Sequence, residues 1–330
     1  VRAVYGKAVG FAYTNTVTDK SIEETAGRAF KAARASKPDK NWHKLPNQES
    51  YCQTIGTYDK NVVALSSDEL VETAAIMLEA TTAYDKRGLA VGGGVGASVF
   101  HTAVVNSSGV EGIDRGTAVG CSMETIARDG ANVTPACFEV DAKRVYDIDA
   151  EAVGVEAARQ AVSSLGAKKI ESGVFPVIFA QPAFRSLLYY TLINAVKADY
   201  VQRERSAFKD KIGEKVASEI VTVWDDGLLD GGLSTSKFDG EGVPCQKTVV
   251  IDKGVLKNFL YDNYTANKAK VESTGNASRS GLASYASTPV LEASNFTFKQ
   301  GNKTAEELVT EVDEGLLVVG WRCKIRANDL

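Results

Sequence analysis

The hydrophobic pattern changes its period in the middle of the chain, and this change constrains the fold more than any other feature. From residue 89 to residue 140, small or apolar residues tend to alternate with polar ones, which is typical of β-strands. Antiparallel strands are expected at residues 99–105, 116–126 and 132–140. Turn-forming residues separate them at 106–109 and 128–130, so the region is predicted to be a β-meander.

Helices are expected on both sides of this meander. Ser66 and Glu69 have the spacing of a capping box, and a helix is predicted at residues 68–84. A second helix is predicted at residues 150–165, where alanines and valines gather on one side. The order helix, meander, helix predicts an α+β fold with mixed and antiparallel sheets and flanking helices, rather than a doubly wound sheet.

The segments on either side of this middle region suggest three domains. Residues 1–13 are predicted to form a strand, and Ser21 with Glu24 is predicted to cap a helix that ends near Ala35, before Pro38. The predicted domains are residues 1–60, an α/β piece with a linker, residues 61–170, a middle α+β domain, and residues 171–330, a C-terminal mixed-sheet domain.

The C-terminal third mixes short strands with one longer helix. Strands are predicted at 174–180, 219–224, 289–298 and 316–319, a hairpin at 248–260, a helix at 184–197 and a helix capped by Thr304 and Glu307. The strand at 174–180 is expected to be buried because it is almost entirely apolar.

Charge and cysteine usage exclude several classes of protein. The 330 residues carry a formal net charge of −4, which gives no electrostatic footprint for nucleic acid. No apolar run reaches the roughly 18 residues that a membrane span needs. Five cysteines without a C-x-x-C pair indicate reduced thiols, so a cytoplasmic location is predicted.

Residues 92–97 match the dinucleotide pattern G-x-G-x-x-A. That pattern requires a helix to follow, because the helix N-terminus binds the pyrophosphate. Here a strand pattern follows, so the segment is predicted to be a flexible loop between strands rather than a nucleotide site.

The residues that usually form metal or catalytic centres are sparse. Only two histidines occur, His43 in a polar linker and His101 in a strand pattern, and neither has the partners that a zinc or nucleophile site requires. Asp225, Asp226 and Asp230 could bind calcium, but their spacing does not match an EF-hand loop. Aspartate followed by glycine is typical of turns, and turns are the favoured interpretation.

The helix predicted at 184–197 contains neither histidine nor glutamate. Leu188, Leu192 and Val196 follow one another at intervals of four residues and predict one buried face. Tyr190 and Asn194 lie one turn apart. From the residues alone, this helix is interpreted as a packing element.

A series of short motifs in the second half of the chain resembles the TldD/PmbA family, also called the modulators of DNA gyrase. The motifs are Ser206-Ala-Phe208, residues 212–218, 222–227, 239–244 and 254–257, and the run Ser273-Thr-Gly-Asn-Ala-Ser-Arg279. Their order and spacing are more specific than any single motif. Residues 11–15 also resemble the end of the family's first domain, so the resemblance extends over nearly the whole chain.

The resemblance implies which residues occupy the family's zinc site. The TldD member carries an H-E-x-x-x-H helix, with a cysteine farther along the chain, and the PmbA member lacks the motif. In register from Ala207, the two histidines and the glutamate correspond to Tyr189, Asn194 and Tyr190 respectively. The family has a longer stretch before its closing Asn-Asp-Leu than the chain has after residue 319, so Cys323 is not assigned as a ligand.

The resemblance therefore implies a PmbA/TldE-like subunit without catalytic residues, metal or other cofactor. It also implies a zinc-bearing TldD-like partner, flexible peptides as substrates, and a homodimer when the subunit is alone. Two alternatives remain open: an active peptidase with an atypical site, and a regulatory or binding protein without a peptidase partner.

Overall fold

The computed structural model describes residues 1–279 and 286–320 and has the predicted α+β fold. The contacts divide the chain into two compact units. Unit 1 consists of Val1–Lys44, Glu171–Asp225 and Lys247–Leu330, and unit 2 consists of Leu45–Ile170 and Asp226–Gln246. The three domains predicted from the sequence are contiguous segments, whereas each of the two units combines segments that are distant in the sequence. The three-domain division stays a prediction.

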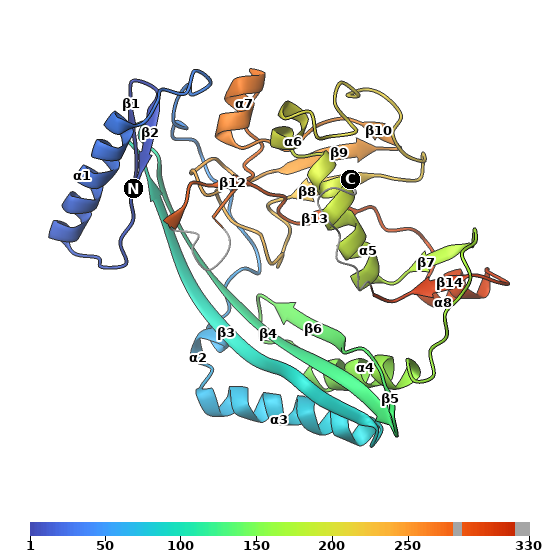
Figure 1. Ribbon diagram of the computed structural model, residues 1–330. Helices are drawn as coiled ribbons and strands as arrows, with labels where there is room; N and C mark the ends of the chain where they lie inside the picture. The colour runs from blue at the N-terminus through green and yellow to red at the C-terminus, as the bar shows by residue number, and fades with distance from the viewer. Residues whose placement is uncertain (280–285, 321–330) are drawn as a thin grey trace. The chain divides into compact units, whose positions relative to one another are not determined.

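Unit 2 is built on the meander. Its elements are α2 (Lys60–Ala64), α3 (Ser67–Tyr84), β3 (Gly88–Val105), β4 (Glu111–Asp129), β5 (Asn132–Val133), β6 (Cys137–Lys143) and α4 (Ala150–Ser163) (Figure 1). β4 pairs with β3, β5 and β6, each time antiparallel. The turns at 106–109 and after β4 lie where the sequence predicts them, and the strands β3 and β4 are longer than predicted.

The glycine-rich run at 92–97 is not a loop, and this prediction was wrong. It lies inside β3, where Gly93 pairs with Met123 and Ala97 with Val119. The register shifts between Ala90 and Gly92, and Gly93 has a φ of 144°, a conformation that favours glycine. The glycines therefore carry a bulge in a continuous long strand.

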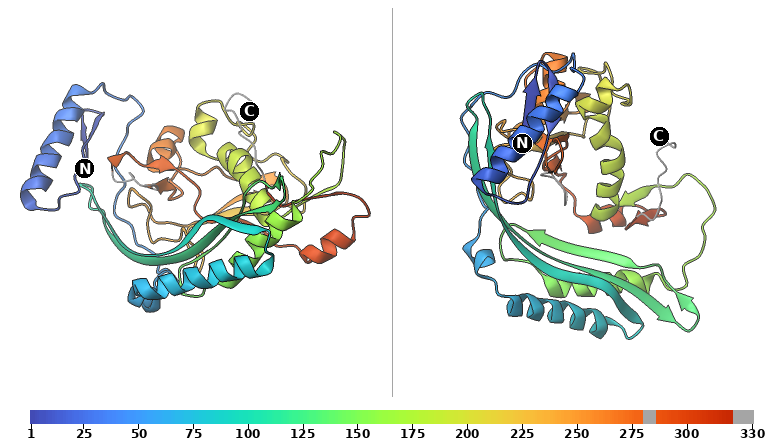
Figure 2. Two further views of the ribbon diagram at one scale, coloured as in Figure 1. Left: turned by 60° about the horizontal axis from the view of Figure 1, so that its bottom comes forward. Right: turned by 60° about the vertical axis from the view of Figure 1, so that its left-hand side comes forward.

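Helices α3 and α4 pack against each other and cover one face of this sheet (Figure 2). Met77, Cys121, Met123, Val153 and Ala157 form the buried core between the helices and the sheet. The helices approach closely at Gly154, where an added Cβ would lie 2.3 Å from the carbonyl oxygen of Met77. A side chain at this position would force the helices apart.

Unit 1 contains several small sheets. Its N-terminal part is the hairpin β1 (Arg2–Tyr5) and β2 (Ala8–Phe11) with α1 (Asp19–Ala35). A four-stranded sheet has the order β10 (Val255–Leu256), β9 (Lys247–Asp252), β8 (Val223–Asp226) and β13 (Phe296–Phe298). Two-stranded sheets pair β11 (Ala277–Ser278) with β12 (Val290–Leu291), and β7 (Val177–Phe179) with β14 (Leu316–Val318).

The remaining helices of unit 1 are short. They are α5 (Gln181–Leu188), the π-helical turn η1 (Tyr189–Ile193), α6 (Ala198–Gln202), α7 (Asn263–Ala269) and α8 (Ala305–Thr310). The buried core of the unit joins the end of the η1 segment to the four-stranded sheet through Val196, Val223, Val250, Leu256 and Leu260.

The capping predictions were right in two cases of three. Ser66 caps α3 and Thr304 caps α8, each with its glutamate partner. At α1 the cap is Thr18, whose side chain accepts a hydrogen bond from the Ser21 backbone N–H, so the helix begins one turn earlier than predicted. An upstream threonine therefore competes successfully with Ser21 for the cap position.

The predicted strands of the C-terminal third are shorter in the structure. β7 covers three residues and is not buried, with Val177 41% exposed. The segment 289–298 forms two strands in two different sheets. Apolar runs of this length fix the extended conformation but not the partner strand or the burial. The hairpin of β9 and β10 and the last strand β14 are confirmed.

None of the helices in the described part of the chain has the length and apolar character that crossing a membrane requires.

The close contact at Gly154 gives a stability prediction. We expect Gly154→Ala to destabilise the protein by about 1–3 kcal/mol, because the added methyl group overpacks the contact between α3 and α4. Gly27 in α1 is the matched control, because an added Cβ there meets no atom within 4 Å. Gly27→Ala should stabilise its helix by about 0.5–1 kcal/mol. Urea unfolding of both variants checks the opposite signs, and a stabilised Gly154→Ala variant would contradict the packing.

Candidate functional site

The candidate site is the helical segment at 181–196 and the loop that returns to its C-terminal end. Pro182 lies in the first turn of α5, where its missing N–H costs nothing. Residues 189–193 then adopt a π-helical turn. The segment ends at Val196, whose carbonyl oxygen accepts a hydrogen bond from Leu260 N–H at 2.9 Å. The predicted helix at 184–197 is thus confirmed, but one turn of it is not α-helical.

The π-turn changes which residues share a face. An α-helix turns by about 100° per residue, so side chains five residues apart diverge by roughly 140°. A π-turn closes hydrogen bonds from residue i to residue i+5, which brings residues of that spacing onto adjacent turns. Tyr189 and Asn194 are five residues apart across η1. A turn of this kind reduces the angle between these two positions relative to a regular α-helix, and a hollow beside it is lined by Tyr190 and Asn194.

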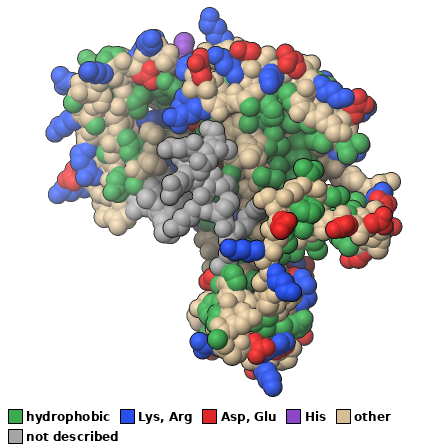
Figure 3. Space-filling model, turned by 45° about the vertical axis from the view of Figure 1, so that its right-hand side comes forward, with side chains coloured by type: hydrophobic (Ala, Val, Ile, Leu, Met, Phe, Trp, Pro, Cys, Tyr) green, Lys and Arg blue, Asp and Glu red, His purple; other side chains and the backbone are tan. Residues whose placement is uncertain are grey.

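A surface hollow of about 1090 Å³ lies beside this turn. From the helical segment it is lined by Tyr190, Leu192 and Asn194, and from the return loop by Tyr200, Arg205 and Phe208 among others. Hydrophobic side chains gather over part of the face shown in Figure 3, beside charged groups. The lining of the hollow is mostly aromatic and aliphatic, and Glu204 and Arg205 are the charged residues in it.

Ser206 fixes the return loop to the end of the helical segment. Its Oγ donates a hydrogen bond to the carbonyl oxygen of Ala195 at 2.5 Å and accepts one from Phe208 N–H at 3.0 Å. A backbone bond from Arg205 N–H to Tyr200 O closes the same loop. The Ser206-Ala-Phe208 motif therefore shapes one wall of the hollow.

The charges at the hollow do not form an acid–base pair. Glu204 accepts a hydrogen bond from Lys209 Nζ at 2.7 Å, and this bond lowers the pKa of the Glu204 carboxyl. A general base works best with a pKa near the operating pH, so the shift has the wrong direction. Among the described residues no acidic side chain forms an ion pair with Arg205, whose guanidinium is exposed at the rim.

The two tyrosines are half exposed and contact each other. Tyr189 and Tyr190 are 52% and 48% exposed, and their rings lie edge to face with centroids 5.2 Å apart. Val196 is fully buried, and Leu192, which also lines the hollow, packs against the core of unit 1. Of the predicted apolar stripe, Val196 is confirmed as buried, and Leu188 and Leu192 are only partly buried.

The aspartates at 225–230 form turns and a buried network. Asp225 is 1% exposed and accepts hydrogen bonds from Asn276 Nδ2 at 2.7 Å and from Ser294 N and Oγ at 2.8 Å. Asp226 accepts from Leu228 N–H within its own turn. Asp225 and Asn276 belong to two of the sequence motifs, so these motifs join β8 to the segment before β11.

The histidines and cysteines are not brought to the hollow. His43 lies in an exposed loop and His101 on β3, both exposed. Cys121 and Cys245 are buried, and burial raises the pKa of the Cys121 thiol. Cys323 lies outside the described residues. No group of three His, Cys, Asp or Glu side chains that could hold a metal occurs in residues 1–279 and 286–320.

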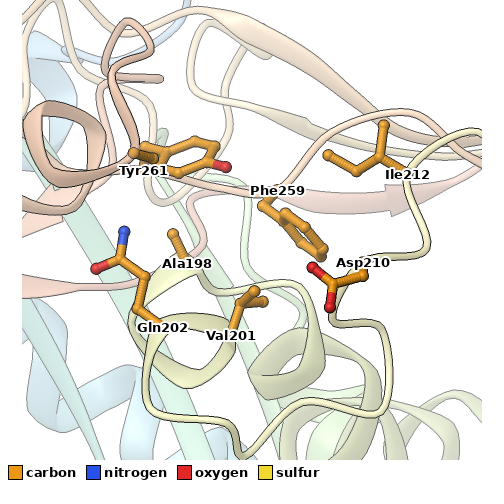
Figure 4. A pocket seen from close by; sticks show the side chains of 8 residues that line it. Ala198, Val201, Gln202, Asp210, Ile212, Phe259 and Tyr261 are labelled. Carbon is orange, nitrogen blue, oxygen red and sulfur yellow. The ribbon is translucent and has the colours of Figure 1, made fainter.

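A smaller cavity of about 240 Å³ lies between α6 and the segment after β10 (Figure 4). Its lining is largely apolar, with Val201, Ile212 and Phe259, and Asp210 and Gln202 are at its margin. Gln202 Nε2 donates to the carbonyl oxygen of Thr265, and burial raises the pKa of the Tyr261 phenol. Gln202 is therefore already bonded and the Tyr261 phenol is held in its neutral form, and the rest of the lining is largely apolar.

Sequence reasoning located the helical segment but missed the π-turn and the hollow. A turn with i to i+5 bonds has no residue signature of its own, because its two tyrosines, Thr191, Leu192 and Ile193 are residue types that occur in α-helices as well. The motif at 206–208 was the available signal for the hollow, since Ser206 makes the contact that closes its wall.

Comparison with known proteins identifies relatives over the whole chain. Profiles of the PmbA/TldA metallopeptidase family match residues 1–33 as domain 1, 60–165 as the central domain and 172–328 as the C-terminal domain. The chain is 33% identical to an uncharacterized protein of Methanocaldococcus jannaschii over 308 residues, which is 93% of the chain and 69% of that protein. A metalloprotease of the same organism is 29% identical over 98% of the chain and 71% of its own length.

Among solved structures, TldE from Thermococcus kodakarensis superposes with a TM-score of 0.88. It is 29% identical, and the match covers 98% of the present chain and 72% of that one.

The side chains of the helical segment give a prediction about zinc. We expect the purified protein to hold no stoichiometric zinc, because Tyr189, Tyr190 and Asn194 offer none of the nitrogen and sulfur donors that zinc prefers. Elemental analysis after dialysis measures the zinc content. About one tightly held zinc per chain would contradict the prediction.

Histidine variants test the geometry of the π-turn in the same assay. The double variant Tyr189→His/Asn194→His should bind zinc more tightly than either single variant, because the turn brings positions five residues apart together. Equal binding by the double and single variants would show that the two positions do not converge.

Proposed function

The chain belongs to the PmbA/TldD metallopeptidase family, and from this premise we propose that it is a zinc-free, PmbA/TldE-type subunit of a cytoplasmic peptidase complex. One observation carries the proposal. The positions that the family resemblance matches to its zinc helix carry Tyr189, Tyr190 and Asn194, in and directly after a π-helical turn, and none of them is a histidine or a glutamate. The similarity to a TldE structure supports the same assignment.

The residues present do not fit a catalytic zinc. A tyrosine hydroxyl ionises with a pKa of about 10, so Tyr189 is a poor ligand near neutral pH. The Asn194 amide offers a hard oxygen, whereas zinc in proteins prefers nitrogen and sulfur. Tyr190 cannot replace the carboxylate that activates a bound water. The hollow of this chain is therefore assigned no catalytic step.

We propose that the hollow shapes the path of a flexible peptide and that a TldD-like partner supplies the zinc site. Half-exposed aromatic rings such as Tyr189 and Tyr190 suit contact with extended chains, because they bury a large area with few torsions to fix. The scattered cysteines without a C-x-x-C pair support a cytoplasmic location.

The proposal is tested by co-purification and reconstitution. A tagged copy of this chain, isolated from its source, should retain a TldD-like protein with an intact H-E-x-x-x-H helix. Peptide cleavage should then require that partner, and the present chain alone should show none. Cleavage by the isolated chain would favour the active peptidase, and isolation without any peptidase partner would favour the binding protein.

Tyr190 gives a mutational prediction. Tyr190→Phe keeps the ring and removes one hydroxyl that is exposed at the hollow, worth about 0.5–1.5 kcal/mol at most. Cleavage by the reconstituted complex should therefore stay within a few-fold of the wild type. Removal of a true general base typically costs about 10²–10⁴-fold in rate. Loss of cleavage in a variant that melts like the wild type would show that this helix carries chemistry.

Leu192→Ala tests the packing role of the same helical segment, whereas Tyr190→Phe tests its chemistry. Leu192 packs on the core of unit 1 from a partly buried position, so its truncation should cost about 2–3 kcal/mol, the lower end for a leucine. Thermal melts of both variants should separate a stable Tyr190→Phe from a destabilised Leu192→Ala. Equal melting temperatures of the two variants would show that the side chain of Leu192 does not stabilise this helical segment.

We further propose that the isolated chain is a homodimer and that the partner replaces one copy in the complex. Light scattering at micromolar concentration should give twice the mass of the chain, about 70 kDa from 35.2 kDa per copy. A monomer, both with and without the partner, would contradict this assembly.

A further inference from the structure

The outer edge of β3 lacks the usual protection of an edge strand. β3 runs for 18 residues, and within the described part of the chain β4 is its one pairing strand. The strand contains no Lys, Arg, Asp, Glu or Pro. Edge strands in proteins are normally short, carry charged side chains or are interrupted by proline, because their free backbone groups would otherwise recruit other strands. This edge therefore has the character of a pairing surface.

The register shows which backbone groups are available. Asn106 N–H donates to Val110 O, and the register continues with Val104 opposite Gly112. Because hydrogen-bonded pairs alternate along an antiparallel ladder, the even-numbered residues of this stretch bond to β4 and the odd-numbered ones point outward. The outward residues are Gly93, Val95, Ala97, Val99, His101, Ala103 and Val105. No backbone bond within residues 1–279 and 286–320 satisfies their outward groups.

The side chains along the edge are open to solvent as well. Val99 is 47% exposed and Val105 is 75% exposed, and the glycines between 92 and 96 leave the backbone uncovered. Glycine within a strand allows another backbone to approach closely. The edge is thus accessible in both its backbone and its side chains.

We propose that a second copy of this chain pairs with β3 along this edge, antiparallel, with the two-fold axis at Val99. The proposal names the surface of the homodimer proposed above and rests on it. A strand that pairs with itself across a two-fold axis is necessarily antiparallel. With the axis at Val99, every outward residue from Gly93 to Val105 faces an outward residue of the second copy.

The distribution of side-chain sizes favours a second copy over an unrelated strand. Residues 92–98 are small except for Val95, and residues 99–105 are bulky except for Ala103. Self-pairing about Val99 places each small residue opposite a larger one. The facing pairs are Gly93 with Val105, Gly94 with Val104, Val95 with Ala103, Gly96 with Thr102, Ala97 with His101 and Ser98 with Phe100.

Charge favours the same occupant. The chain has a net charge of −4, so two copies repel each other weakly as a whole. The edge carries no charged residue, and a second β3 therefore meets no like charge along the strand. Pairing of two copies along this edge therefore adds no like-charge contact within the strand.

A charge exchange at the axis tests the surface. Val99→Lys and Val99→Glu each place two like charges opposite each other and should raise the dimer dissociation constant by about tenfold or more. Mixing the two variants places lysine opposite glutamate and should restore a dimer that contains one of each. Sedimentation velocity measures the three samples. Ile113→Lys, at an exposed position on β4, is the control and should leave the dimer unchanged.

Cysteine crosslinking tests the register. Directly paired residues lie about 5.5 Å apart between their Cα atoms, within the range that a disulfide spans. Under mild oxidation Val99→Cys should link two copies, whereas Ala97→Cys should not, because its facing position is His101. Linkage at Ala97 and not at Val99 would overturn the register.

The outcomes separate this surface from the homodimer itself. A wild type that is monomeric at micromolar concentration overturns both. A wild-type dimer that survives Val99→Lys and Val99→Glu overturns the β3 surface and leaves the homodimer standing. Circular dichroism of each variant confirms that the half-exposed position tolerates the change and that the strand is folded.

Discussion

The helical segment that carries the candidate site is held in unit 1 by backbone pairing at its C-terminal end. Leu260 N–H donates to Val196 O, and Ala198 N–H donates to Leu260 O, so the chain leaves the helix as one side of a short parallel bridge. Val196 and Leu260 are both fully buried in the core that includes the four-stranded sheet. The position of the π-turn relative to the sheet therefore follows from this pairing.

A buried ion pair strengthens the same junction. Lys197 is 6% exposed, and its Nζ lies 3.0 Å from the Glu292 carboxylate. A charged group buried at this depth requires a partner, because its removal from water is otherwise costly. Glu292 N–H in turn donates to Asn276 O, and Asn276 donates to the buried Asp225. The junction and the aspartate network thus form one polar layer under the site.

The sequence predicted those features that depend on neighbouring residues. The capping boxes at Ser66 and Thr304 and the α+β order of elements are local, and the structure confirms them. The glycine run was misjudged because β-propensity counts glycine against a strand, whereas pairing with β4 along its whole length holds it there. The extent and partners of the C-terminal strands also depend on contacts between distant residues, which short apolar runs do not encode.

The candidate site was predictable as a set of positions but not as a shape. Register with the family motifs placed Tyr189, Tyr190 and Asn194 on one helix, and the structure shows one continuous helical segment there. The π-turn could not be read from these residues, because its cost is offset by tertiary contacts such as Leu192 against the core. The turn is set by backbone hydrogen bonds of longer spacing, so the angle between Tyr189 and Asn194 depends on the backbone and not on the residue types at these positions.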